Sequence, residues 1–449
     1  MIEDQRGIPL TGADAEAVSR YEIAVRQMVS YVGDPVATLE EALAGRPEFV
    51  AGRLTQALIL LTLAERRYHG LAVEAYAAAE PWLATANPRE QGLARAIRHF
   101  LEGDLAATSL ALDHQLMAWP KDLAALAAGH LVDFYRGDAV NLRNRVSRVL
   151  HHWSPADTGY SFVLGMHAFG LEEMNQYSEA EESANAALEI EPKDGWAIHA
   201  GAHVMEMTGL IAEGIDWLES REEDWAPDNA FAFHNWWHLA LFYLDGGHVA
   251  KVLSLYDRHI DAPADSPLLT LIDRTAILWR LFLEGVDLGG RMEAVADEWE
   301  ACLEREAGFY AFNDYHAALA FVATGRGQAL ERWQALARGK TAGPAQAMMA
   351  RDVGQPLTEA FQAFAAGNYG RAIELLERTR PHAHLAGGSH AQRDLLTLTL
   401  VEAALRAHDS TRARHYLGER QTHKPASRWA RRLLVRAALA DVTHTGSGH

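Results

Sequence analysis

The stretch SFVLGMHAFGLEEMNQYSEAEESANAALEIEPKD, residues 161–194, has the pattern of one helical hairpin. Apolar residues recur every three or four positions on both sides of a polar turn at residues 175–177, as they do on one face of a helix. A row of small residues lines the second half of the stretch: Ala180, Ala184 and Ala187. Small side chains permit a close helix crossing, and Pro192 ends the second helix because proline cannot continue it. The stretch therefore predicts two antiparallel helices joined by a short turn.

This 34-residue unit resembles a tetratricopeptide repeat. Further helix–turn–helix copies precede and follow it, and repeated units of this kind stack into a solenoid. We expect an all-α fold, a right-handed superhelical solenoid of tetratricopeptide-like hairpins that is closed enough to enclose a polar cavity. Residues 15–438 are expected to form this single solenoid, between an N-terminal leader at 1–14 and a flexible C-terminal tail at 439–449.

The composition favours a folded protein outside membranes. The chain has 449 residues, of which 49% are hydrophobic, and this is enough to bury a large core. Its net charge of −19 disfavours nucleic acids and anionic membranes, which both bind basic surfaces. There is no signal-peptide pattern, and no apolar run approaches the roughly 18 residues that span a membrane. We expect a cytoplasmic protein with no nucleic-acid or membrane partner, and the sequence leaves a homo-oligomer open.

Over nearly its whole length the chain is similar to the tetratricopeptide repeat protein 38 family. The resemblance rests on long and unusual segments: GMHAFGLEE at 165–173, WAIHAGAHVMEM at 196–207, HNWWHLALF at 234–242, FNDYHAAL at 312–319 and GGSHAQRD at 387–394. It implies a helical-repeat fold, and it implies no settled chemistry.

One repeat carries a row of polar and aromatic residues in groove positions. In tetratricopeptide repeats, positions 2, 5, 9 and 12 face the concave groove. Counted from Gly195, these positions hold Trp196, His199, His203 and Glu206. The last three are spaced by four and three residues, so they share one face of the helix.

Neighbouring repeats place similar residues at related positions. The preceding repeat offers Glu172, the following one offers His234, Trp237 and His238, and a later one offers Asp314 and His316. We therefore expect imidazoles and carboxylates from at least three repeats to converge on one cavity.

The segment GGSHAQRD predicts a loop that runs into a helix. Ser389 is a natural N-cap, and the backbone N–H groups after it can bind a carboxylate or phosphate, with His390 or Arg393 helping. The alternative is plain capping, with Arg393 and Asp394 paired for structure.

Three functions remain open. The first is a pocket for a small molecule or short peptide, with acid–base catalysis by the residues His199, His203, Glu206, His234 and His238. Its further ligand-binding candidates are Trp196, Trp237, Glu172, Asp314, His316, Ser389, His390 and Arg393.

The second function is a metal-dependent enzyme in which His199, His203 and Glu206 hold zinc, iron or manganese. The third is a scaffold that grips a protein partner in its groove. A fully structural reading also stands, in which the same side chains form satisfied hydrogen bonds between helices.

Overall fold

The computed structural model describes residues 2–264, 266–340 and 343–445, and these residues are almost entirely helical. They fall into two compact units. Unit 1 comprises residues 1–201, 222–232 and 342–345, and unit 2 comprises residues 202–221, 233–341 and 346–449. The all-α, tetratricopeptide-like helical-repeat fold is confirmed. The single solenoid over 15–438 and the enclosed polar cavity stay predictions.

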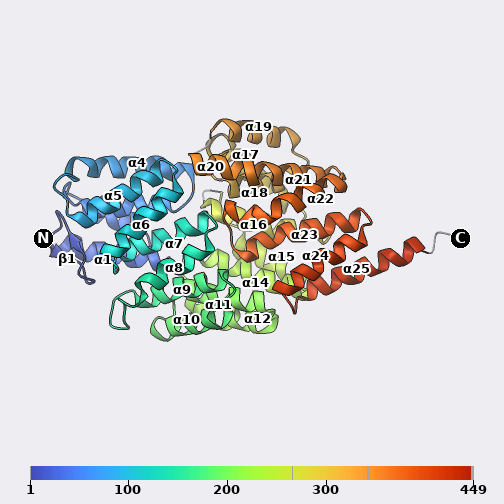
Figure 1. Cartoon of the computed structure of the whole chain (residues 1–449), viewed down its shortest axis with the longest axis horizontal. Coiled ribbons are helices and arrows are strands. Elements are labelled where there is room, and N and C mark those ends of the chain that lie inside the picture. The colour runs from blue at the N-terminus through green and yellow to red at the C-terminus, as the bar shows by residue number, and fades with distance from the viewer. Residues whose placement is uncertain (1, 265, 341–342, 446–449) are drawn as a thin grey trace. The chain divides into compact units, whose positions relative to one another are not determined.

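Unit 1 is built from consecutive helices that pack as hairpins (Figure 1). They are α1 (Ala15–Ser30), α2 (Pro35–Leu43), α3 (Val50–Leu61), α4 (Arg66–Ala79), α5 (Pro88–Leu101), α6 (Leu105–Ala118), α7 (Leu123–Tyr135), α8 (Ala139–Leu150), α9 (Tyr160–Glu173), α10 (Tyr177–Ile190) and the first half of α11 (Gly195–Thr208). The short helices η1 (Glu80–Trp82) and α13 (Glu222–Trp225) complete it.

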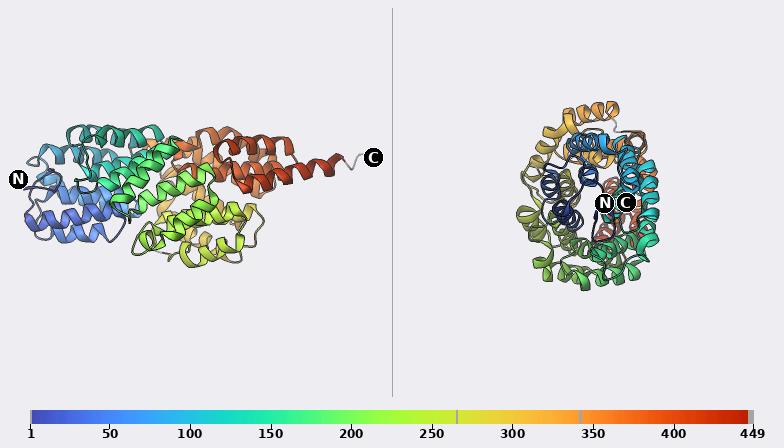
Figure 2. Two further views of the ribbon diagram at one scale, coloured as in Figure 1. Left: turned by 90° about the horizontal axis from the view of Figure 1, so that it is seen from below. Right: turned by 90° about the vertical axis from the view of Figure 1, so that its left-hand side faces the viewer.

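Unit 2 continues the pattern with the second half of α11 and the helices that follow. They are α12 (Ile211–Ser220), α14 (Ala232–Gly246), α15 (Val249–Leu255), η2 (Tyr256–Ile260), α16 (Leu268–Leu283), α17 (Arg291–Glu306), α18 (Ala311–Ala323), α19 (Gly327–Gly339), α20 (Pro344–Met349), η3 (Ala350–Gly354), α21 (Gln355–Ala365), α22 (Tyr369–Thr379), η4 (Arg380–Ala386), α23 (His390–Arg406), α24 (Ser410–His423) and α25 (Arg428–Thr445). Figures 1 and 2 show α23, α24 and α25 side by side in red.

The hairpin predicted at residues 161–194 is confirmed as α9 and α10. Asn175 in the turn has a φ of 60°, a left-handed conformation that asparagine tolerates better than most residues. The alanines of the second helix are buried where they face α9: Ala180, Ala184 and Ala187. Helix α10 ends at Ile190, two residues before the proline.

The two ends of the chain differ from the expected loose segments. Residues Ile2–Glu3 and Pro9–Leu10 form a small antiparallel hairpin, and Leu10 is fully buried. Asn87 donates to the carbonyl of Pro9, so the leader is fastened to unit 1. At the other end α25 runs to Thr445, and the last part of the expected tail, residues 446–449, lies outside the described residues. Within the described part of the chain, every helix is too short or too polar to cross a bilayer.

Candidate functional site in unit 2

Three buried histidines of unit 2 lie together on α11 and α14. The ring centres of His203 and His238 are 4.4 Å apart, and those of His234 and His238 are 4.9 Å apart. Their exposed fractions are 0% for His203 and His238 and 5% for His234. Each ring offers a nitrogen atom, and these nitrogens lie within 4.8 Å of one another. We call His203, His234 and His238 the histidine centre.

Carboxylates orient two of the three rings. Nδ1 of His234 lies 2.5 Å from Oδ2 of Asp273 on α16, and Nδ1 of His238 lies 3.1 Å from Oε2 of Glu206 on α11. A neutral imidazole that donates from Nδ1 carries its lone pair on Nε2. The carboxylates therefore select the tautomer in which Nε2 is the electron-pair donor, the arrangement commonly found around metal ions.

The surroundings favour the neutral form of the central imidazole. Burial, and then the positive potential of His203 and His234, hold the pKa of His238 well below its ordinary value. Burial raises the pKa of the Asp273 carboxyl, and the pairing with His234 opposes that rise. A neutral imidazole is the form that binds metal ions, so His238 does not need to release a proton at neutral pH before it can act as a ligand.

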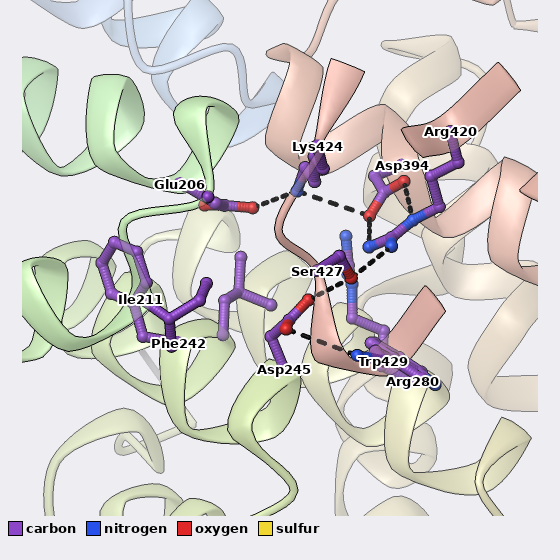
Figure 3. A pocket seen from close by; sticks show the side chains of 12 residues that line it. Glu206, Ile211, Phe242, Asp245, Arg280, Asp394, Arg420, Lys424, Ser427 and Trp429 are labelled. Carbon is purple, nitrogen blue, oxygen red and sulfur yellow. Dashed lines mark hydrogen bonds and ion pairs between the residues drawn. The ribbon is translucent and has the colours of Figure 1, made fainter. Parts of the chain in front are cut away.

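A chain of ion pairs extends from Glu206 toward the C-terminal helices, and Figure 3 shows it. Lys424 contacts Glu206 and lies 3.4 Å from Asp394 on α23, which pairs with Arg420 of α24 at 2.8 Å. Burial opposes ionisation of Asp394, but the Arg420 and Lys424 cations outweigh it and lower the pKa of that carboxyl. We call Glu206, Lys424, Asp394 and Arg420 the ion-pair chain.

A cavity of unit 2 adjoins this chain. It encloses about 390 Å³ of space between atoms, a volume that includes open solvent at its mouth. The part that can hold the centre of a water molecule is much smaller and suits roughly one or two waters. Of all the predicted site residues, only Glu206 lines it. This cavity therefore differs from the expected His- and Trp-lined pocket, which stays a prediction.

The other predicted residues of unit 2 have structural contacts. Trp237 is fully buried, and its ring stacks on His234 at 5.2 Å. Asp314 accepts hydrogen bonds from Trp333 Nε1 at 2.8 Å and from the backbone of Gly308 at 2.9 Å. The ring of His316 packs on Phe312 at 4.6 Å.

The expected cap at the start of α23 is confirmed. The Ser389 hydroxyl accepts from the backbone N–H of Gln392, and the Gln392 side chain accepts from the backbone N–H of Ser389. His390 is the first residue of the helix, and Arg393 donates to the carbonyl of Gly388. Asp394 pairs with Arg420 and Lys424, in contrast to the pair with Arg393 that was one alternative.

Three predicted residues belong to unit 1. The ring of His199 lies 5.0 Å from the rings of Trp196 and Phe231. Trp196 also stacks on Tyr31 at 5.8 Å. Glu172 is buried on α9. His199 thus falls in a different unit from His203 and Glu206, and the ligand set formed by these three stays a prediction.

Sequence reasoning missed Asp273 and Arg280, which both lie on α16. A signal was present, because both are charged residues inside the apolar run LLTLIDRTAILWRLFL and are seven positions apart, on one helix face. It also missed Lys424, which contacts Glu206 across 218 positions of sequence. No local pattern marks a pair so far apart.

No family model matches the chain. Among solved structures, the human IFIT1 dimer with m7Gppp-AAAA is 14% identical, with 95% of each chain covered and a TM-score of 0.44. The human IFIT1 dimer with PPP-AAAA is 15% identical, with 92% of this chain and 99% of that chain covered and a TM-score of 0.42. These likenesses concern the fold.

The comparison corrects the expectation of no nucleic-acid partner. The IFIT1 chains that match this one over most of its length are solved with capped or triphosphate RNA. The expectation rested on the net charge of the whole chain, and a total of −19 does not describe the potential at one local surface. The net charge of the whole chain therefore does not by itself exclude a nucleic-acid partner.

Proposed function

We propose that unit 2 binds a divalent metal ion through His203, His234 and His238, in a protein of the tetratricopeptide repeat protein 38 family. The observation that carries the proposal is the grouping of three ring nitrogens within 4.8 Å of one another. Nitrogens that bind one zinc ion at about 2.1 Å in tetrahedral geometry lie roughly 3.4 Å apart. Zinc binding would therefore bring these nitrogens closer together by up to about 1.4 Å.

The carboxylate partners support ligation. Asp273 and Glu206 accept from the Nδ1 atoms of His234 and His238, so each ring presents Nε2 in its electron-pair-donating form. Imidazole ligands suit zinc, copper, iron and nickel, and zinc is the first metal to test. A metal held by three imidazoles retains a coordination position for water or ligand, and it lowers the pKa of the bound water.

Free acid–base catalysis by the same histidines is a weaker proposal. A general acid or base works best when its pKa lies near the working pH. Burial and nearby positive groups move the pKa of His238 well away from neutrality, in the direction that suits a ligand. We assign Glu206 to positioning His238, because its carboxylate contacts both that ring and Lys424.

The proposal includes the expected ligand and location of the protein. The metal centre would bind a small molecule or a short peptide, and the protein would be cytoplasmic. A protein-interaction scaffold remains the second candidate, because it is the usual role of stacked helical repeats.

The test is metal content and metal binding of protein purified without a polyhistidine tag or chelator. We expect elemental analysis to find about one metal ion per chain, and calorimetric titration of the stripped protein with zinc to restore that stoichiometry. The variants His203→Ala and His238→Ala should lose this binding, whereas His316→Ala, which removes another buried histidine of unit 2, should keep it. Zinc binding of equal strength in all three variants would contradict the proposal.

A further inference from the structure

The cavity of unit 2 is lined by as many basic as acidic residues, and one of the basic residues has no carboxylate in direct contact within the described part of the chain. Six charged residues line it: Arg280, Arg420, Lys424, Glu206, Asp245 and Asp394. Arg420 and Lys424 pair with Asp394 and Glu206 in the ion-pair chain. Asp245 accepts from the Ser427 hydroxyl at 2.6 Å and from the backbone N–H of Arg428 at 2.7 Å. Five of the six charged side chains therefore have either an oppositely charged partner or hydrogen-bond donors in direct contact.

Arg280 is the exception among the described residues. No carboxylate oxygen of the described residues lies within 4.0 Å of its guanidinium, although the side chain is only 1% exposed. Its hydrogen bonds go to backbone carbonyls, those of Ala276 at 3.0 Å and Ala391 at 2.7 Å. Burial lowers the pKa of Arg280, and the more distant Asp394 and Glu206 carboxylates oppose that effect.

The ring of Trp237 packs against this arginine. The guanidinium carbon of Arg280 is 5.3 Å from the ring centre of Trp237. A buried charge without a counter-ion in direct contact costs free energy. A bound anion that contacts the guanidinium would offset this cost.

We propose that the cavity is a binding site for the carboxylate group of a small ligand, with Arg280, which lines it, as its anchor. A carboxylate accepts two parallel hydrogen bonds from a guanidinium, the strongest pairing available to arginine. The enclosed part of the cavity holds roughly one or two waters, so a carboxylate group would have to replace them, and the remainder of the ligand would lie toward the open mouth. Arg280 is not one of the proposed metal ligands, but Glu206 both lines this cavity and contacts His238, so the two sites are tested by separate measurements.

The test is calorimetric titration of the metal-stripped full chain with acetate in a buffer free of other carboxylates. Acetamide, which has the same shape without the charge, is the control ligand. We expect acetate to bind and acetamide not to bind. Phosphate binding without acetate binding would overturn the carboxylate assignment, and the absence of acetate binding would overturn the site.

Two variants and a matched control test the anchor. Arg280→Gln should weaken acetate binding at least about tenfold, and Arg280→Lys, which keeps the charge but loses the paired donors, about three- to tenfold. Arg274→Gln is the control, because Arg274 is a buried arginine of the same helix that pairs with Glu298 and does not line the cavity. If Arg280→Gln does not fold, Arg280→Lys decides, and unchanged acetate affinity in it overturns the proposal. Zinc stoichiometry of the variants is measured separately, so failure of this site and failure of the metal centre are distinguishable.

Discussion

Glu206 and His238, on α11 and α14, are joined by a hydrogen bond of 3.1 Å between Oε2 and Nδ1, and the same carboxylate contacts Lys424 at the end of α24. One buried side chain thus connects the histidine centre with the ion-pair chain. The charge of Glu206 is shared between an imidazole that it orients and an ammonium that it neutralises. Changes at the ion-pair chain should therefore reach the histidine centre through Glu206.

Asp273 should control metal affinity without touching the metal. Its Oδ2 atom holds His234 at 2.5 Å. Removing a partner of this kind typically costs about 10- to 100-fold in metal affinity. We expect Asp273→Asn to weaken zinc binding by that factor in a competitive titration while circular dichroism stays unchanged.

The matched control for Asp273 is Asp314, another buried carboxylate of unit 2, which accepts from Trp333 Nε1. Asp314→Asn should leave the zinc affinity as it is. Equal losses in both variants would mean that the effect is a general consequence of altering a buried carboxylate, and would count against the oriented-histidine interpretation.

The ion pair of Lys424 with Glu206 should be worth more than a surface pair. Their side chains are 7% and 6% exposed. Removing one partner of a buried pair leaves an uncompensated charge and typically costs about 3–5 kcal/mol. We expect Lys424→Met to lower the free energy of unfolding by that order, and Lys424→Met combined with Glu206→Gln to lose less than the sum of the single changes.

The control pair for this double-mutant cycle is Arg332 with Glu304, whose side chains are 66% and 57% exposed. Its coupling energy should fall in the range of about 0–1 kcal/mol that exposed pairs give. Additive effects of Lys424→Met and Glu206→Gln in urea denaturation would refute the buried coupling.

The repeat register could be predicted well from local sequence. The frame counted from Gly195 coincides with the first residue of α11, and the helix has the face that brings His203 and Glu206 toward α14. This succeeded because helical periodicity and a fixed repeat length constrain each helix independently of the rest of the chain. The meeting of His203 and His238 follows from the packing of neighbouring repeats.

The chemistry of Glu206 could not be predicted in the same way. Because it is in register with two histidines, the sequence pattern predicts a metal ligand at Glu206. Its contact with Lys424 depends on a residue 218 positions later in the chain, which no local pattern indicates. His316 shows the same limit. It has the right residue type and a corresponding register position, yet its Nδ1 atom lies 2.8 Å from the carbonyl of Phe312 on its own helix. Register gives the direction of a side chain, whereas its partners come from long-range packing.

His316 should make unit 2 sensitive to acid. Burial, with a contribution from Arg280, lowers its pKa to about 3, compared with 6.5 in the unfolded chain. Between these pH values the unfolded chain binds a proton that the folded chain does not, so stability is lost as the pH falls from about 6.5 toward 3. The loss has an upper bound of roughly 5 kcal/mol.

The measurement for His316 is the slope of unfolding free energy against pH over that window. We expect a shallower slope in His316→Gln, whatever its stability at neutral pH. His415→Gln, at an exposed histidine of α24, should keep the slope of the parent protein. A slope that is identical in all three proteins would show that His316 does not titrate in this way.

Asp194 of unit 1 should have the opposite pH dependence. It caps α11, since its Oδ1 atom accepts from the backbone N–H groups of Trp196 at 3.1 Å and Ala197 at 3.0 Å. Its Oδ2 atom is buried and has no hydrogen-bond partner among the residues that the structure describes, and burial raises the pKa of the carboxyl from 3.8 to about 7. The folded state therefore holds a proton that the unfolded chain releases above about pH 4, and stability falls as the pH rises through about 7.

Asparagine caps a helix as well as aspartate does and carries no charge. We expect Asp194→Asn to be more stable than the parent at pH 8, by an amount that is bounded at roughly 4 kcal/mol and shrinks toward zero near pH 4. Denaturant unfolding followed by tryptophan fluorescence at pH 4, 6 and 8 measures this difference. Asp104→Asn, at the half-buried N-cap of α6, should show no comparable gain. A gain at Asp194 that does not change with pH would point to better packing of the amide and would exclude the protonation mechanism.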